Sequence, residues 1–139
     1  MNLRMTVLVG ALVIVPATFA IGCGGGGDAG SGDPAQVTED FFNAIAAGDG
    51  ETACGLLSKV GLGNIPKDPN TCAEEVSSLS EEQRSMFEPS NVEQVTGHTE
   101  HCGTIKPSET DAETVATVNG DVQCVNLSKI DGEWKINDT

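Results

Sequence analysis

One short segment of the chain gathers side chains of the types that bind metal ions. It holds the only two histidines of the chain, His98 and His101, together with Glu100 and Cys102. In a β-strand, residues three positions apart point to opposite faces of the sheet, so the two imidazoles would diverge. No two cysteines have the Cys-x-x-Cys spacing that is typical of zinc sites. The sequence therefore favours two surface histidines near the end of a strand, and we expect no metal ligands and no cofactor.

Carboxylates are numerous in this chain but do not form long acidic blocks. The sequence has 21 Asp and Glu against 7 Lys and Arg, a formal net charge of −14. The acids are scattered, which is typical of a solvated surface. No basic patch exists to neutralise phosphates, so the composition excludes a nucleic-acid partner. Asp40 is the one acid beside the apolar face of the first predicted helix, and its place at the edge of that face favours solvent. We expect no catalytic residues.

Four cysteines lie beyond residue 23, and an even number in an exported domain indicates disulfides. Three pairings are open to four cysteines. We favour the two that lie within one half of the chain each, and each bridge would contribute roughly 3 kcal/mol. The second pairing requires that no third strand separates its cysteines, since the bridge spans only a short distance. The favoured pairs are Cys54–Cys72 and Cys102–Cys124.

The N-terminal segment has the pattern of a secretory signal peptide. A positive start with Arg4 precedes an apolar run over residues 6–21. That run is shorter than the roughly 20 residues that a bilayer crossing needs. The sequence therefore predicts a cleaved signal peptide over residues 1–22 rather than a spanning helix.

The end of this segment, Ala20-Ile21-Gly22-Cys23, resembles the lipobox of bacterial lipoproteins. The resemblance implies that Cys23 is acylated and becomes the mature N-terminus, so the membrane is a partner through the lipid anchor. We expect the protein at the extracytoplasmic face of the cell membrane. Residues 24–32 are nearly all Gly or Ser, which is typical of a flexible tether. Lipidated cysteine and tether therefore occupy residues 23–32, and a single domain follows over residues 33–139.

The first half of that domain has helical patterns. Asp33 is a good N-cap, Pro34 suits the first helical position, and Gly48 is a typical C-cap glycine. Apolar residues recur between them with helical spacing. These are Val37, Phe41, Ala44 and Ile45.

Three shorter helical segments follow. We predict a helix over residues 51–60 and a loop over residues 61–70, which holds several Gly and Pro residues. Capping-box patterns open two more helices, at Thr71-Cys72-Ala73-Glu74 and at Ser80-Glu81-Glu82-Gln83. Pro89 ends the last of them.

The second half has strand patterns. Asn119-Gly120 and Asp131-Gly132 are signals for tight hairpin turns. The strands predicted around them span residues 92–100, 112–118, 121–130 and 133–137. Helices followed by a meander of strands indicate an α+β fold, in which the N-terminal helices pack on one face of a curved antiparallel sheet.

Two groups of residues carry a resemblance to a known family. They are Pro34, Val37, Phe41 to Ala44, Gly48-Asp49 and Ala53 to Ser58 in the helices, and Val125 to Lys129 and Asp131 to Ile136 in the strands. With these residues the domain, over its whole length, resembles the nuclear transport factor 2-like superfamily, and small actinobacterial-type lipoproteins of unknown function carry this domain. The resemblance implies a cone, in which a bent sheet wraps the helices around an apolar cavity.

The superfamily includes dehydratases, ketosteroid isomerases and epoxide hydrolases as well as many proteins without chemistry. The isomerase and dehydratase members place a carboxylate base and a Tyr or a second acid inside the cone. This chain has no Tyr, so we favour a non-enzymatic protein, with an enzyme of that type as the alternative.

Two binding roles remain open. A small apolar ligand could occupy the cavity, or the open sheet face could contact an envelope protein or a second copy as a homodimer. The Thr, Ser and Asn residues at alternate strand positions favour a solvated sheet face. Trp134 could stack on a ligand, but its alternation with Ile136 favours a core position. The side chains expected to line the cavity are Phe41, Ile45, Leu127, Trp134 and Ile136.

Overall fold

The computed structural model describes residues 30, 32–59, 69–103 and 105–138. Within them, four helices precede a four-stranded antiparallel sheet, so the predicted α+β class is confirmed. The predicted signal peptide, Cys23, nearly all of the tether and most of the loop predicted over residues 61–70 lie outside the described residues.

The first helix, α1, spans Pro34–Ala47 and has the predicted ends. The carboxylate of Asp33 accepts a hydrogen bond from the backbone N–H of Gln36 at 2.9 Å. Gly48 ends the helix at φ 74°, a left-handed conformation that glycine adopts without steric cost. The predicted apolar face is buried, as is the neighbouring Phe42.

The other helices are α2 (Gly50–Gly55), α3 (Pro69–Ser78) and α4 (Glu81–Ser85). The prediction of a helix over residues 51–60 was wrong about its end. The chain after Gly55 runs beside the last strand, where the Ser58 N–H donates to the Ile136 carbonyl at 2.8 Å and the Ile136 N–H donates to the Leu56 carbonyl at 2.9 Å. These bonds satisfy backbone groups that a longer helix would have used.

The two predicted capping boxes have different outcomes. Helix α3 starts at Pro69, so the pattern at Thr71 lies inside the helix, and proline takes the first helical position, where its missing N–H costs nothing. The capping box between Ser80 and Gln83 is confirmed, with both reciprocal hydrogen bonds present.

The strands are β1 (Pro89–Gln94), β2 (Asp111–Val118), β3 (Asp121–Ile130) and β4 (Glu133–Asp138), paired in chain order. Both predicted turns are confirmed by the positive φ of Asn119-Gly120 (51° and 83°) and of Asp131-Gly132 (54° and 89°). The first strand was predicted too late in the chain. It begins at Pro89, which an edge strand tolerates at its first residue, and after Val95 the chain leaves the sheet as a long loop.

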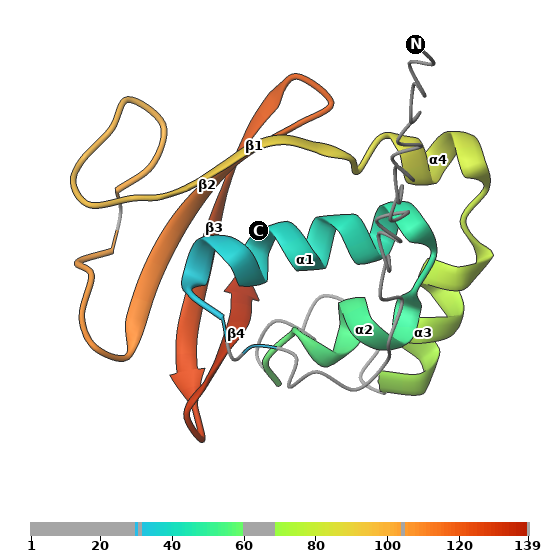
Figure 1. Cartoon of the computed structure of the whole chain (residues 1–139), viewed down its shortest axis with the longest axis horizontal. Helices are drawn as coiled ribbons and strands as arrows, with labels where there is room; N and C mark the ends of the chain where they lie inside the picture. The colour runs from blue at the N-terminus through green and yellow to red at the C-terminus, as the bar shows by residue number, and fades with distance from the viewer. Residues whose placement is uncertain (1–29, 31, 60–68, 104, 139) are drawn as a thin grey trace, which may run out of the picture.

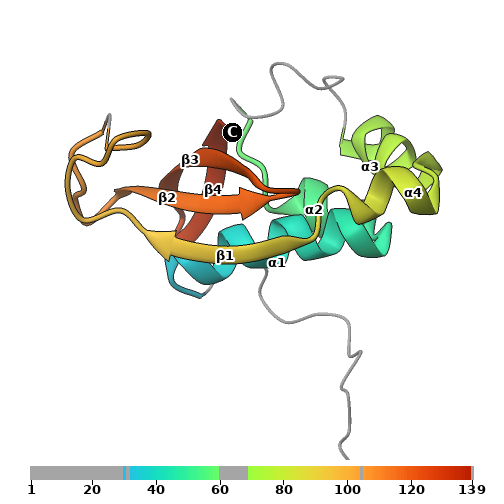
Figure 2. The same cartoon turned by 90° about the horizontal axis from the view of Figure 1, so that it is seen from above.

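Helix α1 packs along one face of the sheet, and α2, α3 and α4 extend beyond the sheet at one end of the molecule (Figures 1 and 2). The long β1–β2 loop lies at the opposite end (Figure 1). One polar pair crosses the core, where the Thr38 and Thr114 hydroxyls are 2.7 Å apart. The strands turn the following apolar side chains toward the helices: Ala116, Val118, Val125, Leu127 and Ile136.

Candidate functional site

An apolar hollow lies between α1, α3 and α4. Its volume is about 310 Å³, near the lower end of the range for small-molecule sites. Its lining comes from α1, from α3 and from the residues that precede and follow α4, and apolar side chains dominate it. The lining residues are Phe41, Phe42, Ile45, Cys72, Glu75, Val76, Leu79 and Phe87.

Helical spacing and one disulfide position this lining. On α3, Cys72 and Val76 are four residues apart and therefore lie on one face, toward the core. The Cys54–Cys72 disulfide, with a Cα–Cα distance of 6.1 Å, ties α3 to α2. Val76, Leu79 and Phe87 are only partly buried where they pack against the core, so the hollow remains accessible from solvent.

The chemistry of the hollow is that of an apolar binding site with one charge. The Phe41 and Phe42 rings meet edge to face at 5.3 Å between centroids. Among the described residues, Glu75 is the only charged one in the lining. These lining residues offer no partnering donor or nucleophile beside its carboxylate, which suits binding better than the two-group acid–base chemistry of isomerases.

The residues predicted to line a cavity separate into two sets. Phe41 and Ile45 line the hollow between the helices. Leu127 and Ile136 are 1% and 0% exposed in the core between α1 and the sheet. Trp134 is partly buried against that core, with the Lys129 ammonium 5.5 Å from its ring centroid.

Six lining residues were not among those predicted to line a cavity: Phe42, Cys72, Glu75, Val76, Leu79 and Phe87. Phe42 lies beside the predicted apolar face rather than on it, while the other five come from α3 and from the residues beside α4, whose position against α1 is set by tertiary packing. The available signal was compositional, because all three phenylalanines beyond residue 23 line this one hollow.

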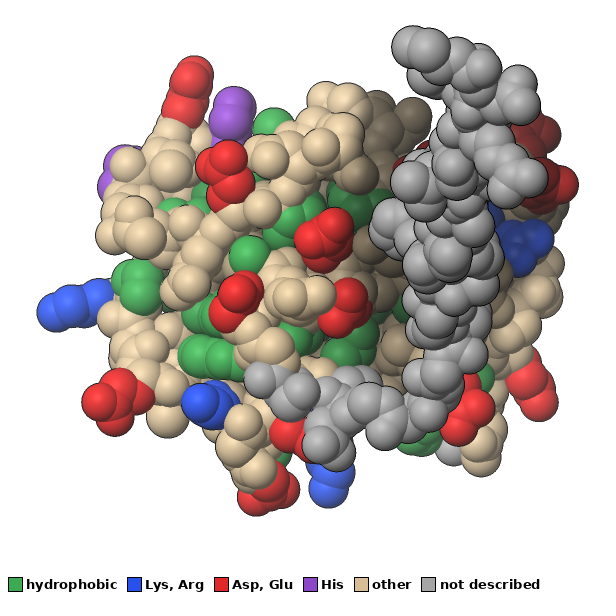
Figure 3. Space-filling model, viewed as in Figure 1, with side chains coloured by type: hydrophobic (Ala, Val, Ile, Leu, Met, Phe, Trp, Pro, Cys, Tyr) green, Lys and Arg blue, Asp and Glu red, His purple; other side chains and the backbone are tan. Residues whose placement is uncertain are grey.

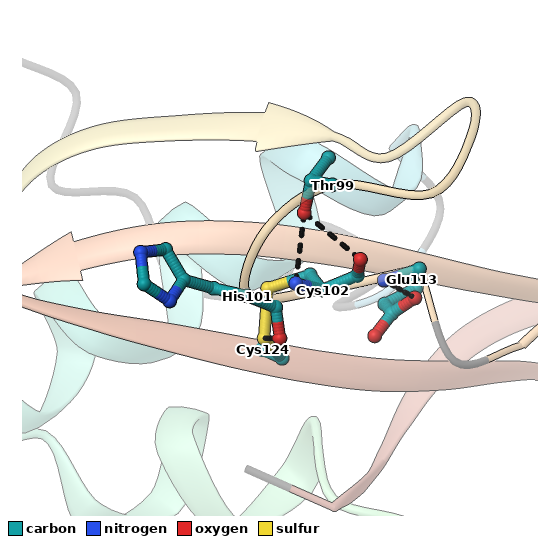
Figure 4. The surroundings of a disulfide bond; sticks show 6 residues. Thr99, His101, Cys102, Glu113 and Cys124 are labelled. Carbon is teal, nitrogen blue, oxygen red and sulfur yellow. Dashed lines mark hydrogen bonds between the residues drawn. A yellow bond between two sulfur atoms is a disulfide. The ribbon is translucent and has the colours of Figure 1, made fainter.

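A second cluster surrounds the other disulfide (Figure 4). Cys102, in the β1–β2 loop, bonds Cys124 on β3 across a Cα–Cα distance of 5.6 Å. The predicted obstacle of an intervening strand does not arise, because Cys102 belongs to a loop. Both favoured pairings are therefore the ones present.

Glu113 on β2 lies beneath this loop and is 1% exposed. Its carboxylate accepts a hydrogen bond from the Gly103 N–H at 2.7 Å, and the Thr99 hydroxyl accepts one from the Cys102 N–H at 2.8 Å. The sequence offered no sign of a buried Glu113, since its strand position predicts a solvated outer face. The disulfide and these bonds hold the loop across that face.

This second cluster does not form a metal site in the oxidised chain. Ligand atoms of Cys102, Glu113 and Cys124 lie within 4.8 Å of one another. Both sulfurs are bonded to each other, however, and thiolates rather than disulfide sulfurs are metal ligands. His98 and His101 are exposed, and the His101 ring points away from the sulfurs (Figure 4).

Two other acids, Asp40 and Asp111, lie outside the hollow. Asp40 is exposed on α1 and does not line the hollow. Asp111 accepts hydrogen bonds from the hydroxyls of Ser108, Thr110 and Ser128 at 3.0, 3.0 and 3.1 Å. These bonds, that from Ser108 first, hold the pKa of Asp111 below its usual value. The ionised carboxylate thereby fastens the end of the β1–β2 loop to β3.

Exposed large apolar side chains do not gather into one patch among the described residues. Met86 follows α4, whereas Val122 and Ile130 lie near opposite ends of β3; their exposed fractions are 50%, 43% and 43%. Isolated side chains of this kind are normal on a protein surface.

Among the described residues, no helix has the length and apolar character that a membrane crossing requires. Comparison of the chain with family models, with curated proteins and with solved structures finds no significant match. The residues of the chain and their geometry therefore carry the functional argument.

Proposed function

We propose that the protein is a lipid-anchored, extracytoplasmic binding protein that takes a small apolar molecule into the hollow between α1, α3 and α4. The lipobox-like residues 20–23 support the anchor, and the Gly- and Ser-rich residues 24–32 support a tether of the domain to the membrane. The single observation that carries the binding function is the apolar hollow lined by three phenylalanines.

The size of the hollow sets the scale of its ligand. At about 30 Å³ for a water-sized group, 310 Å³ holds roughly ten non-hydrogen atoms. At about 0.5 kcal/mol per atom, which lies between the bounds for very small and for drug-sized ligands, the binding free energy is about 5 kcal/mol. That corresponds to a dissociation constant of roughly 0.2 mM.

We also propose a nuclear transport factor 2-like cone as the fold. The order of helices followed by an antiparallel meander supports it, as does the packing of α1 along the sheet. In this proposal the binding site lies at the helical end of the domain. A non-enzymatic role is favoured because Glu75 has no second catalytic group in the lining.

The anchor is tested in the full chain by replacing Cys23 with Ala and fractionating cells. We expect loss of the lipidated form, seen as an uncleaved or unanchored protein. Gly24→Ala is the matched control, because it changes the next residue and keeps the acylated sulfur. Normal lipidation and membrane attachment of the Cys23→Ala variant would disprove the anchor.

Ligand binding is tested by NMR titration of the chain from Gly24 to Thr139 with toluene and cyclohexanol. All the described contacts lie within this part of the chain. We expect saturable shifts at residues around the hollow, and their loss when Val76→Trp fills it. Ile130→Trp adds the same side chain at an exposed site on β3 and is the control. Equal binding by both variants would place the ligand elsewhere.

A further inference from the structure

We propose that the hollow selects apolar molecules that carry a positive charge, such as substituted ammonium compounds, over neutral and anionic ones. This inference rests on the proposed binding function and names the class of ligand. Three features carry it: the aromatic lining, the one carboxylate at the hollow, and the excess of acids on the helices that enclose it.

The aromatic lining suits a cation. The face of a phenyl ring carries partial negative charge and attracts an ammonium group within about 6 Å. Phe41, Phe42 and Phe87 all line a hollow of about 310 Å³, so a cation inside it lies near phenyl rings. A favourable cation–ring contact strengthens binding by roughly 2- to 30-fold.

Glu75 supplies the matching negative charge. It is the one charged lining residue in the part of the chain that the structure describes, and it is exposed, so an ammonium group beside it keeps part of its hydration. The burial cost that opposes a fully enclosed ion pair is therefore reduced. The apolar part of the same ligand would pack against Ile45, Val76 and Leu79.

The helices around the hollow add to the negative potential. Among the described residues, their one basic side chain is Arg84, and its guanidinium donates to the Ala47 carbonyl at 3.1 Å, at the end of α1. Acidic side chains outnumber basic ones on the visible face as well (Figure 3). Such a field favours cations and repels carboxylates. The acids on and beside α3 and α4 are Glu74, Glu75, Glu81, Glu82 and Glu88.

An inorganic cation does not fit the same residues. Calcium and magnesium are held by several oxygen ligands, whereas the described lining residues offer one carboxylate among apolar groups. An organic cation meets the lining differently, because its hydrocarbon part buries apolar surface while its charge meets Glu75.

The test uses three probes of nearly equal size with the chain from Gly24 to Thr139. Benzyltrimethylammonium is cationic, neopentylbenzene is its neutral isostere, and phenylacetate is anionic. We expect NMR titration at low salt to show at least roughly 5-fold tighter binding of the ammonium than of the isostere, with phenylacetate weakest. The preference should shrink at high salt, because ions screen the exposed carboxylate.

Two variants distinguish the effect of the Glu75 carboxylate from that of the overall negative charge of the surrounding helices. Glu75→Gln removes the carboxylate at the hollow, and we expect it to lower ammonium affinity several-fold while leaving neopentylbenzene unchanged. Glu74→Gln removes the same formal charge one residue away, outside the lining, and should change ammonium binding much less.

The outcomes distinguish this inference from the proposed function. If neopentylbenzene binds as tightly as the ammonium, the inferred selectivity is wrong and apolar binding stands. If Glu75→Gln leaves the preference intact, the carboxylate at the hollow does not select the cation, and that part of the inference is wrong. If no probe binds at millimolar concentration, the proposed binding function fails together with the inference.

Discussion

Removing the Cys102–Cys124 disulfide should loosen one end of the molecule in particular. The bridge spans 22 positions in sequence, and the chain-entropy relation for such a loop gives about 3 kcal/mol of stabilisation at 25 °C. For a domain of this size, that loss lowers the melting temperature by roughly 10 to 20 °C. We therefore expect the Cys102→Ser, Cys124→Ser double variant to fold at room temperature with a much lower melting temperature.

The loss of the disulfide should expose backbone amides mainly in the β1–β2 loop. The disulfide and the Gly103–Glu113 hydrogen bond both hold the β1–β2 loop over the sheet. Amide hydrogen exchange followed by NMR should therefore show the largest loss of protection at Thr99, Cys102 and Gly103. Amides of α1 should keep their relative protection, because α1 contacts the other face of the sheet.

The Cys54→Ser, Cys72→Ser double variant is the matched control. Its bridge spans 18 positions, so the expected stability loss is nearly the same, about 3 kcal/mol. Its exchange pattern should differ, with faster exchange in α2 and α3 and a protected β1–β2 loop. Identical exchange patterns in the two variants, or an unchanged melting temperature in either, would refute the assignment of each bridge to its own end of the fold.

Three further predictions concern stability measured by chemical denaturation. Because the Thr38 O–H donates to the Pro34 carbonyl, Thr114 is the donor in the buried pair. Thr38→Val should lower the free energy of unfolding by about 1–3 kcal/mol, and adding Thr114→Val should restore part of that stability. Additive stability losses in the double variant would argue against the hydrogen bond. Trp134→Ala should cost about 1–3 kcal/mol, less than the 3–5 kcal/mol of a fully buried aromatic residue, because the ring is only partly buried; a larger loss would show a core role. The Thr52 hydroxyl and N–H hold the pKa of Asp49 below its usual value. The ionised carboxylate therefore stabilises the fold above the unfolded-state pKa, and this stabilisation is lost as the pH falls through the lower folded-state pKa. The stability difference between the wild type and Asp49→Asn should shrink on acidification, and a difference that stays constant with pH would contradict this prediction.

Part of the candidate site was predictable from sequence. The period of α1 marked Phe41 and Ile45 as inward residues, and both line the hollow. Glu75 and Phe87 could not be assigned to the hollow, because no local sequence pattern predicts which side of α1 the later helices cover. The predicted cavity beside Leu127 and Ile136 depended on the overall packing, and those side chains lie in the core.

Local interactions determined what the sequence alone could specify about this protein. The cap at Asp33, the glycine that ends α1 at Gly48 and the Asn119-Gly120 turn depend on backbone angles and hydrogen bonds within a few residues. The α+β order of elements follows from the change of apolar period along the chain.

Tertiary structure alone decided where long-range partners meet. Residues 56–58 are not helical because their backbone groups form hydrogen bonds with β4 instead. Glu113 is buried because a loop crosses the outer face of its strand. The hollow exists because α1, α3 and the residues beside α4 bring three phenylalanines that are distant in sequence to one place. Such contacts join residues distant in sequence, so their energies depend on the whole fold, and no local pattern encodes them.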